Sequence, residues 1–242
     1  MTSKKAFKND DLVSIIIINF NGGDYILDCI KSVFNTIDCN FEVILVDNNS
    51  TDNSSNLSKE QFKEIRFFQS DKNLGMAARN IGLDNVLGNF TVFLDADTVV
   101  PPNWISILLS SHQQHGQGLY QGKLLKKDNP KIIESGGDMA NVFGTGFARG
   151  RGEKDIGNYE TFQKITFPVG GCTFGLTKIF KEIGYVDESN LFFLMLDDLD
   201  YGWRGWMLGI PSYYEPKCII HHVGSPILKW SSKKFFYMER NR

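Results

Sequence analysis

Strand-like and helix-like segments alternate through the first half of the sequence, and this alternation constrains the fold more than any other feature. Residues 12–20 and 41–47 are apolar and rich in β-branched side chains, as expected for strands that are buried on both faces. A weaker strand is predicted at residues 65–68 and a fourth at residues 91–95. Because helical segments separate these strands, we predict an α/β fold with a doubly wound, mostly parallel central sheet and helices on both faces.

The helices of this half are predicted from apolar spacing and from capping residues. Apolar side chains recur at helical spacing over residues 26–37, and Asp24 is the predicted N-cap. Residues 73–80 are interpreted as a loop that enters a further helix, which Gly88 is predicted to end. A helix over residues 104–115 is predicted after the fourth strand.

The second half is less regular and indicates a smaller subregion. Short strands are predicted at residues 118–124 and 131–134, and the glycine-rich stretch 144–157 is predicted to be a mobile loop. A glycine-lined strand at residues 169–176 and a last strand at residues 213–220 follow. The length of 242 residues suits a single domain of this class.

Composition and charge exclude several classes of protein. The formal net charge of -2 offers no basic footprint for a nucleic-acid partner. No apolar run reaches membrane-spanning length and no apolar core follows the lysines of the first ten residues, so a cytoplasmic location is expected. The cysteines form no CxxC pair and are expected to be buried free thiols; they are Cys29, Cys39, Cys172 and Cys218.

Two aspartates with one residue between them follow the fourth predicted strand. Asp95 and Asp97 would lie at the edge where open α/β sheets bind their ligands. Carboxylate oxygens suit Mg²⁺ or Mn²⁺, which commonly hold substrate phosphates as well. The structural alternative is that Asp95 caps a turn and Asp97 caps the helix near Pro101, and these residues alone leave both interpretations open.

A second acidic group, residues 197–200, follows an apolar run and opens a predicted helix. The helix macrodipole stabilises carboxylates at this end, so Asp197 as a cap with Asp200 in the first turn explains part of the group. Arg204 stands four residues after Asp200, which predicts an ion pair on the helix surface. Trp203 could stack a sugar, although tryptophans at helical spacing are more typical of a core.

These segments together resemble the inverting family 2 glycosyltransferases of the GT-A fold, in the group that includes rhamnosyltransferase-like enzymes of bacterial surface polysaccharides. The chain departs from the family pattern at Asp197, where the family usually has glutamate, so the reach of this carboxylate is shorter. The matching segments, in the family's order, are residues 13–21, 46–52, 73–80, 95–97, 170–172, 197–200 with Arg204, and 222–225.

The resemblance implies a nucleotide-diphosphate sugar donor, linked to thymidine or uridine, across the carboxyl ends of the first strands. It implies that Asp97, with Asp95, holds Mg²⁺ or Mn²⁺, and His222 resembles the position that completes the metal site in some relatives; a core histidine is the alternative. The donor-binding residues that it implies are Asn19, Asn21, Asp47, Asn49, Asn73, Gly75, Arg79, Asp95 and Asp97.

The resemblance also implies an acceptor side and a single displacement that inverts the anomeric carbon. Asp198 is the predicted general base, with Asp197 beside it. The acceptor would be a glycan or a lipid-linked sugar, and its predicted binding residues are Gly171, Asp200 and Trp203. Residues 12–115 would form the nucleotide-sugar-binding half and residues 116–242 the acceptor-binding half of one catalytic domain, 1–242.

The end of the sequence combines lysines with aromatic residues at 233–237. One interpretation is a peripheral contact with the inner face of the cell membrane, and the other is a terminal helix that packs its aromatics on the core. This helical segment ends without a cap, so the natural chain is expected to continue past Arg242.

Three other classes of protein share parts of this pattern. Residues 95–99 fit the nucleophile string of haloacid-dehalogenase-like phosphatases, but that string ends the first strand of its fold, whereas here three predicted strands precede it. Sugar nucleotidyltransferases usually carry a basic glycine-rich loop after their first strand, and residues 21–24 are short and acidic. A non-catalytic nucleotide- or glycan-binding module would not need both acidic groups.

Overall fold

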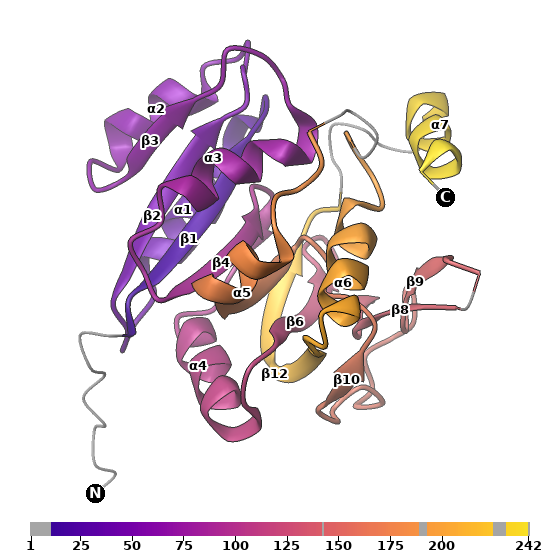
Figure 1. Cartoon of the computed structure of the whole chain (residues 1–242). Coiled ribbons are helices and arrows are strands. Elements are labelled where there is room, and N and C mark those ends of the chain that lie inside the picture. The colour runs from indigo at the N-terminus through magenta and orange to yellow at the C-terminus, as the bar shows by residue number, and fades with distance from the viewer. Residues whose placement is uncertain (1–10, 142, 189–192, 225–230, 242) are drawn as a thin grey trace, which may run out of the picture.

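Alternating strands and helices build the first half of the protein, as predicted (Figure 1). The structure, a computed structural model, describes residues 11–141, 143–188, 193–224 and 231–241. The elements of the first half are β1 (Val13–Asn19), α1 (Gly23–Phe34), β2 (Phe41–Asp47), α2 (Ser54–Gln61), β3 (Arg66–Gln69), the 3₁₀ helix η2 (Gly75–Ala78), α3 (Arg79–Asp84), β4 (Phe90–Asp95), β5 (Thr98–Val99) and α4 (Trp104–His115).

The second half extends the same sheet and adds a small hairpin. Its elements are β6 (Leu119–Lys126), β7 (Ile133–Ser135), β8 (Asp138–Ala140), β9 (Gly146–Ala148), β10 (Gln163–Ile165), β11 (Cys172–Leu176), α5 (Thr177–Ile183), α6 (Asp197–Met207), β12 (Ser212–His222) and α7 (Ser232–Arg240). Within the described residues, no helix has both the length and the apolar character that crossing a bilayer requires.

The central sheet runs in the order β10-β12-β6-β11-β4-β1-β2-β3. Strands β3, β2, β1 and β4 are parallel, so their carboxyl ends meet at one edge. Strand β11 is antiparallel to both of its neighbours, while β12 runs parallel to β6. The predicted α/β fold with a mostly parallel sheet is therefore confirmed.

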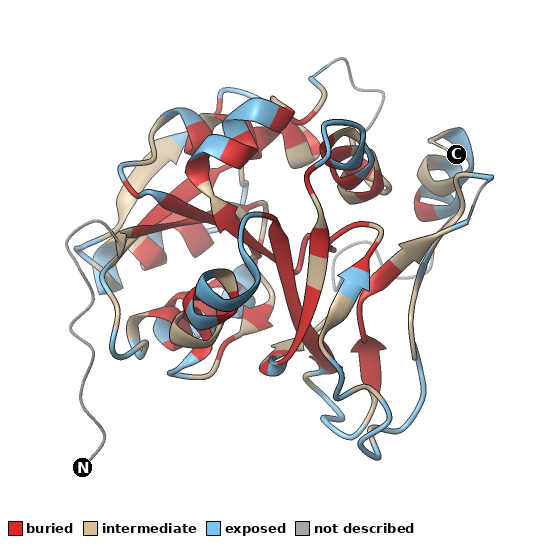
Figure 2. Ribbon diagram, turned by 60° about the horizontal axis from the view of Figure 1, so that its bottom comes forward, coloured by how far each residue is buried: buried red, intermediate tan, exposed pale blue. Residues whose placement is uncertain are grey.

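Helices cover both faces of this sheet because β1 is apolar on both sides. Ile15 and Ile17 pack in one core cluster with residues of α1 and α4, whereas Ile16 packs in a second cluster with residues of α3 and α5. A Cβ at Gly82 would lie 2.4 Å from Ile16 Cγ2, so α3 needs glycine there to pack this closely. Figure 2 shows the sheet strands buried and the outer helix faces exposed.

Two capping predictions for the first half are wrong. Helix α1 begins at Gly23 after the N-cap Gly22, so Asp24 lies in its first turn and caps nothing. The helix ends before Ile37, whose side chain is exposed. Helix α3 ends before Gly88, where a Cβ would lie 2.4 Å from the Leu12 carbonyl oxygen. Close approach to the chain entering β1, and not helix termination, explains that glycine.

Backbone hydrogen bonds hold much of residues 144–157, the stretch that was predicted to be a mobile loop. Strand β9 pairs with β8, Gly152 N donates to Ile133 O at 2.9 Å, and Asp155 N donates to Lys131 O at 2.8 Å. The ammonium group of Lys123, a fully buried residue, lies 3.1 Å from Asp155 Oδ2. The loop prediction is therefore wrong in part, because partners such as Ile133 and Lys131 come from a separate segment of the chain, which the composition of the stretch does not reveal.

Candidate active site

A cavity of about 620 Å³ opens at the carboxyl ends of the parallel strands. Several predicted site residues line this cavity, namely Asn73, Gly75, Asp95, Asp97 and His222. Its other walls are mainly apolar or aromatic and include Ile18, Phe20, Tyr25, Met76, Ala96 and Phe193. A site of this kind, concave and apolar with a few converging polar groups, is typical of small-molecule binding.

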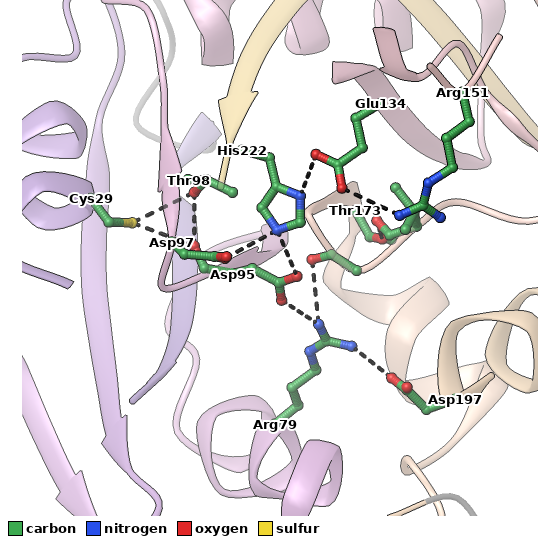
Figure 3. A network of polar contacts seen from close by, with 12 residues as sticks. Cys29, Arg79, Asp95, Asp97, Thr98, Glu134, Arg151, Thr173, Asp197 and His222 are labelled. Carbon is green, nitrogen blue, oxygen red and sulfur yellow. Dashed lines mark hydrogen bonds and ion pairs between the residues drawn. The ribbon is translucent and has the colours of Figure 1, made fainter. Parts of the chain in front are cut away.

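Three predicted ligands for a metal ion meet at one end of this cavity. Asp95 ends β4, Asp97 lies in the turn before β5, and β5 pairs antiparallel with β12 so that His222 stands opposite Thr98. His222 Nε2 lies 3.0 Å from Asp97 Oδ1 and 3.8 Å from Asp95 Oδ2 (Figure 3). One ligand atom from each residue falls within 4.8 Å of the others.

The chemistry of this group fits a divalent cation. Asp97 Oδ2 is buried and has no hydrogen-bond partner among the described residues, which leaves a coordinating atom free. Two carboxylates and one imidazole suit Mn²⁺ better than Mg²⁺, since Mg²⁺ prefers oxygen ligands throughout. The alternative role for Asp97 as a helix cap is wrong, because the N-cap of α4 is Asn103.

The charges of His222 and Asp97 stabilise each other. Burial by itself lowers the pKa of His222, but the carboxylates of Asp97 and Glu134 outweigh it and raise that pKa well above its usual value. Burial would raise the pKa of Asp97, yet the neighbouring His222 holds it below the usual range. For Asp95, burial outweighs the attraction of the Arg79 guanidinium and raises the pKa. An arriving cation would therefore compete with a proton on the imidazole.

Arg79 connects the two acidic groups. Its Nη2 donates to Asp95 Oδ1 at 3.0 Å and to the Gly170 carbonyl oxygen at 3.3 Å, while Nη1 donates to Asp197 Oδ2 at 3.2 Å. The Arg79 side chain is only 6% exposed and its guanidinium lies over the Phe93 ring. Arg79 therefore lies behind the cavity wall, where it fixes Asp95 relative to α6.

The second acidic group opens α6, but its first aspartate is not the N-cap. That position belongs to Leu196, which has a left-handed backbone and no capping side chain. Burial and the neighbouring Asp198 raise the pKa of Asp197 to about 7, against the opposing charge of Arg79. Burial also raises the pKa of Asp198, whose Oδ1 accepts from the Leu199 amide at 2.9 Å.

The predicted acceptor-binding residues do not line the cavity. The predicted pair between Arg204 and Asp200 is confirmed at 3.0 Å. Gly171 is buried, and a Cβ there would lie 2.9 Å from Leu124 Cδ2. Trp203 is 39% exposed and packs against the ring of Trp206, with a centroid distance of 5.5 Å, so the core interpretation of this tryptophan is wrong.

Several predicted donor-binding residues hold the loop after β2. Asn19 Nδ2 donates to Ser54 Oγ at 2.8 Å and to Ser55 Oγ at 2.7 Å, and Ser55 Oγ donates to Asp47 Oδ1 at 2.7 Å. Both Asn19 and Asp47 are buried. Their observed contacts stabilise the loop, and they lie outside the cavity lining.

The remaining two predicted donor-binding residues, Asn21 and Asn49, also lie outside the cavity lining. Asn21 Oδ1 accepts from the Thr51 amide at 2.7 Å and from the Asp52 amide at 3.2 Å. Asn49 is exposed and has a left-handed backbone with φ of 64°. Both asparagines shape turns in which their short polar side chains are favoured.

Asn48 lines the cavity, although the sequence analysis does not predict it as a donor-binding residue. Its Nδ2 donates to the Gly75 carbonyl oxygen at 2.9 Å, and its Oδ1 accepts from the Leu74 amide at 2.8 Å. Gly75 has a φ of +61°, and a Cβ there would lie 1.9 Å from the Phe193 carbonyl oxygen, so glycine is required. Asn48 directly follows Asp47, the last residue of β2, and this position could have indicated its role.

Comparison with known proteins places the chain in a family. Residues 14–184 match Glycosyl transferase family 2, so the chain belongs to this family. An uncharacterized glycosyltransferase of Rickettsia conorii is 31% identical over 153 residues, which cover 59% of this chain and 24% of the relative. Glycosyltransferase GlyG of Streptococcus pneumoniae is 28% identical over 122 residues, which cover 49% of this chain and 40% of the relative.

A shorter match links the chain to a teichoic acid poly(glycerol phosphate) polymerase of Staphylococcus epidermidis, which is 39% identical over 90 residues, or 35% of this chain and 12% of the polymerase. The chain thus spans less than half the length of each of these relatives.

Solved structures confirm the fold. The crystal structure of GalNAc-T7 with UDP, GalNAc and Mn²⁺ superposes with a TM-score of 0.70 at 18% identity, over 90% of this chain and 45% of that chain. Residues 1–349 of S. aureus TarS superpose with a TM-score of 0.60 at 19% identity, over 84% of this chain and 60% of that chain. The GT-A-type architecture is therefore confirmed, and neither the phosphatase nor the binding-module alternative is favoured.

Proposed function

We propose that the protein moves a sugar from a nucleoside-diphosphate donor to a hydroxyl of a glycan or lipid-linked acceptor, in a metal-dependent reaction that inverts the anomeric carbon. The observation that carries this proposal is the position of Asp95, Asp97 and His222 at one end of the cavity, with Asp97 Oδ2 unpartnered among the described residues. Their arrangement supports a site for a cation beside a diphosphate.

Asp97, Asp95 and His222 would hold Mn²⁺ or Mg²⁺. A bound divalent ion supplies positive charge that offsets the charge developing on a leaving diphosphate. The solved structure of GalNAc-T7 contains UDP and Mn²⁺, which supports Mn²⁺ and a uridine nucleotide as first choices for this chain, with thymidine nucleotides as the alternative.

The donor would occupy the cavity between its polar and aromatic walls. Asn48 and Asn73 present neutral amides there, while Phe20 and Tyr25 present aromatic side chains. Amides suit the carbonyl and N–H groups of a pyrimidine, and aromatic faces suit its ring. The nearby Asn19, Asn21, Asp47, Asn49 and Arg79 would act on the donor through the walls that they stabilise.

Asp198 is proposed as the general base. The Asp197 carboxylate is bound by Arg79, whereas Asp198 Oδ1 accepts from the backbone amide of Leu199. An acceptor hydroxyl would transfer its proton to Asp198 as its oxygen attacks the anomeric carbon, and the diphosphate would leave from the opposite face. A single displacement of this kind inverts the anomeric centre.

The two halves of the chain would bind different substrates. Residues 12–115 contribute most of the cavity, so we assign them the donor, and we assign the acceptor to the region 116–242 with Gly171, Asp200 and Trp203. Similarity to enzymes that include a teichoic acid polymerase supports a cell-surface polymer or its lipid-linked precursor as the acceptor. A lipid-linked acceptor would be met at the inner face of the membrane, where α7 could make contact.

The test is nucleoside-diphosphate release from a panel of UDP- and TDP-sugars, with and without acceptors. Release should require Mn²⁺ or Mg²⁺, stop in excess chelator and resume when Mn²⁺ is restored. Asp97→Ala should abolish it, while Asp71→Ala, at an exposed aspartate outside the cavity, should not. Full turnover in excess chelator would refute the metal-dependent mechanism.

A further inference from the structure

Glu134 contacts the nitrogen of His222 that faces away from the metal group. Glu134 lies on β7 and is 9% exposed, and its Oε2 lies 2.9 Å from His222 Nδ1 (Figure 3). The other ring nitrogen, Nε2, points toward Asp97 at 3.0 Å. The imidazole is therefore held between one carboxylate behind it and the predicted metal ligands in front.

This arrangement decides which nitrogen can bind a cation. A neutral imidazole carries one proton, and only the unprotonated nitrogen has a lone pair for a metal. Glu134 accepts a hydrogen bond from Nδ1–H, so when a cation displaces the proton on Nε2 the remaining proton stays on Nδ1 and Nε2 is the ligand atom. A carboxylate behind a ligating histidine also fixes the orientation of the ring and makes the ligand nitrogen more basic.

The position of Glu134 is itself determined by packing around the site. Strand β7 pairs with β6 through the register Leu124↔Ser135 and Leu125↔Ile133. A Cβ on Gly224 would lie 3.0 Å from Glu134 Oε1, so the carboxylate lies against the backbone that follows His222. The preceding residue, Val223, donates its amide to the Asp97 carbonyl oxygen at 3.1 Å.

Glu134 also has a cationic neighbour on the far side. Arg151 Nη2 lies 3.7 Å from Glu134 Oε1, and the Arg151 side chain is 59% exposed. The carboxylate thus has one oxygen toward His222 and the other toward Arg151. This division leaves Oε2 for the imidazole and keeps the buried charge of Glu134 partly compensated.

We propose that Glu134 is a positioning residue of the metal site, which holds His222 in the tautomer and orientation that present Nε2 to a divalent cation. This inference rests on the proposed function, because it assumes that the group of Asp95, Asp97 and His222 binds a metal. Glu134 touches neither donor nor acceptor in this assignment and acts only through the imidazole.

The experiment measures Mn²⁺ binding directly, by titration calorimetry or by the EPR signal of free Mn²⁺, without any substrate. Glu134→Leu removes the acceptor and should weaken Mn²⁺ binding about 10–100-fold, the range seen when such partners of a ligating histidine are lost. Glu134→Gln keeps an oxygen acceptor for Nδ1–H and should retain most of the affinity. Glu153→Gln, at an exposed glutamate on the neighbouring loop, should bind Mn²⁺ like the wild type.

The outcomes distinguish a failure of the proposed role of Glu134 from a failure of the proposed metal-dependent function. If the wild type does not bind Mn²⁺, the metal-dependent mechanism fails and the role of Glu134 fails with it. If the wild type binds but Glu134→Leu binds equally well, only the role of Glu134 is refuted. Equal losses in the Gln and Leu variants would show that negative charge matters and the acceptor position does not, which also overturns the inference.

Thermal unfolding without metal checks that the variants are folded. Should Glu134→Leu fail to fold, Glu134→Asp provides the same test, because its shorter side chain draws the carboxylate away from Nδ1 while keeping the charge. The Asp variant should bind Mn²⁺ more weakly than the Gln variant, and the reverse order would overturn the inference.

Discussion

Arg79 Nη1 lies 3.2 Å from Asp197 Oδ2, and this ion pair joins residues that are 118 positions apart in the sequence. The same guanidinium donates to Asp95, so one buried arginine connects the acidic group after β4 with the acidic group that opens α6. A single side chain thereby links the predicted metal ligand Asp95 to Asp197, the residue beside the predicted general base.

Replacing Arg79 should destabilise the fold strongly. Arg79→Ala leaves the buried Asp197 and the partly buried Asp95 without their cation, so the free energy of unfolding should fall by about 3–5 kcal/mol. Arg79→Lys should recover part of this loss, because an ammonium keeps the charge but cannot replace the planar fork. Urea unfolding at pH 7 measures the free energy of unfolding of both variants. Lys127→Ala is the control, because the ion pair of Lys127 with Asp28 is more exposed. Similar small losses for Arg79→Ala and the control would contradict the prediction.

Asp198→Asn should nearly eliminate sugar transfer while donor binding persists. Asparagine keeps the shape and much of the hydrogen bonding of aspartate but cannot accept a proton at neutral pH, so turnover should fall about 10²–10⁴-fold. Nucleotide affinity, measured by calorimetry, should be unchanged, and NMR of the wild-type product should show an inverted anomeric centre. Near-normal turnover in this variant would move the base to Asp197 or Asp200, and a retained configuration would exclude the single displacement.

Asp138→Asn should change how stability depends on pH. Burial of Asp138, opposed by hydrogen bonds that include one from Ser135, raises its pKa from 3.8 to about 7. Between these two values the folded state holds a proton that the unfolded state releases, so stability falls as pH rises, by about 1.4 kcal/mol per pH unit for one such group. Asparagine does not titrate and still offers an acceptor oxygen to Ser135.

The gain in stability of Asp138→Asn over the wild type should therefore be larger at pH 8 than at pH 4.5, as measured by urea unfolding at both values. A stability difference that does not change between these two pH values would show that Asp138 ionises normally in the folded protein.

Helix α7 should bring the protein to anionic membranes. Phe235 and Phe236 are 51% and 59% exposed, and Lys233 beside them is exposed as well, so these aromatics do not pack into the core. Sedimentation with vesicles should be stronger for anionic than for neutral lipid, and Phe236→Ser should weaken it. Leu87→Ser, at a distant exposed leucine, serves as the control. Equal sedimentation with both lipids would contradict the membrane contact.

Local features of the sequence were enough to predict the parallel half of the sheet and the first acidic group. The runs of β-branched residues in β1, β2 and β4 could bury themselves only between helices, so these strands and their burial on both faces follow from hydrophobic periodicity. The position of Asp95 and Asp97 follows too, because parallel strands that alternate with helices all end at one edge.

Tertiary structure alone decided what each polar side chain of the site contacts. The sequence offers no sign that Arg79 faces Asp197, that Glu134 lies behind His222, or that backbone hydrogen bonds order the glycine-rich stretch. Such pairs form between segments brought together by the packing of strands and helices that are distant in the chain. Periodicity reports which face of an element is buried, whereas the partner of a buried charge depends on how separate elements come to lie against one another.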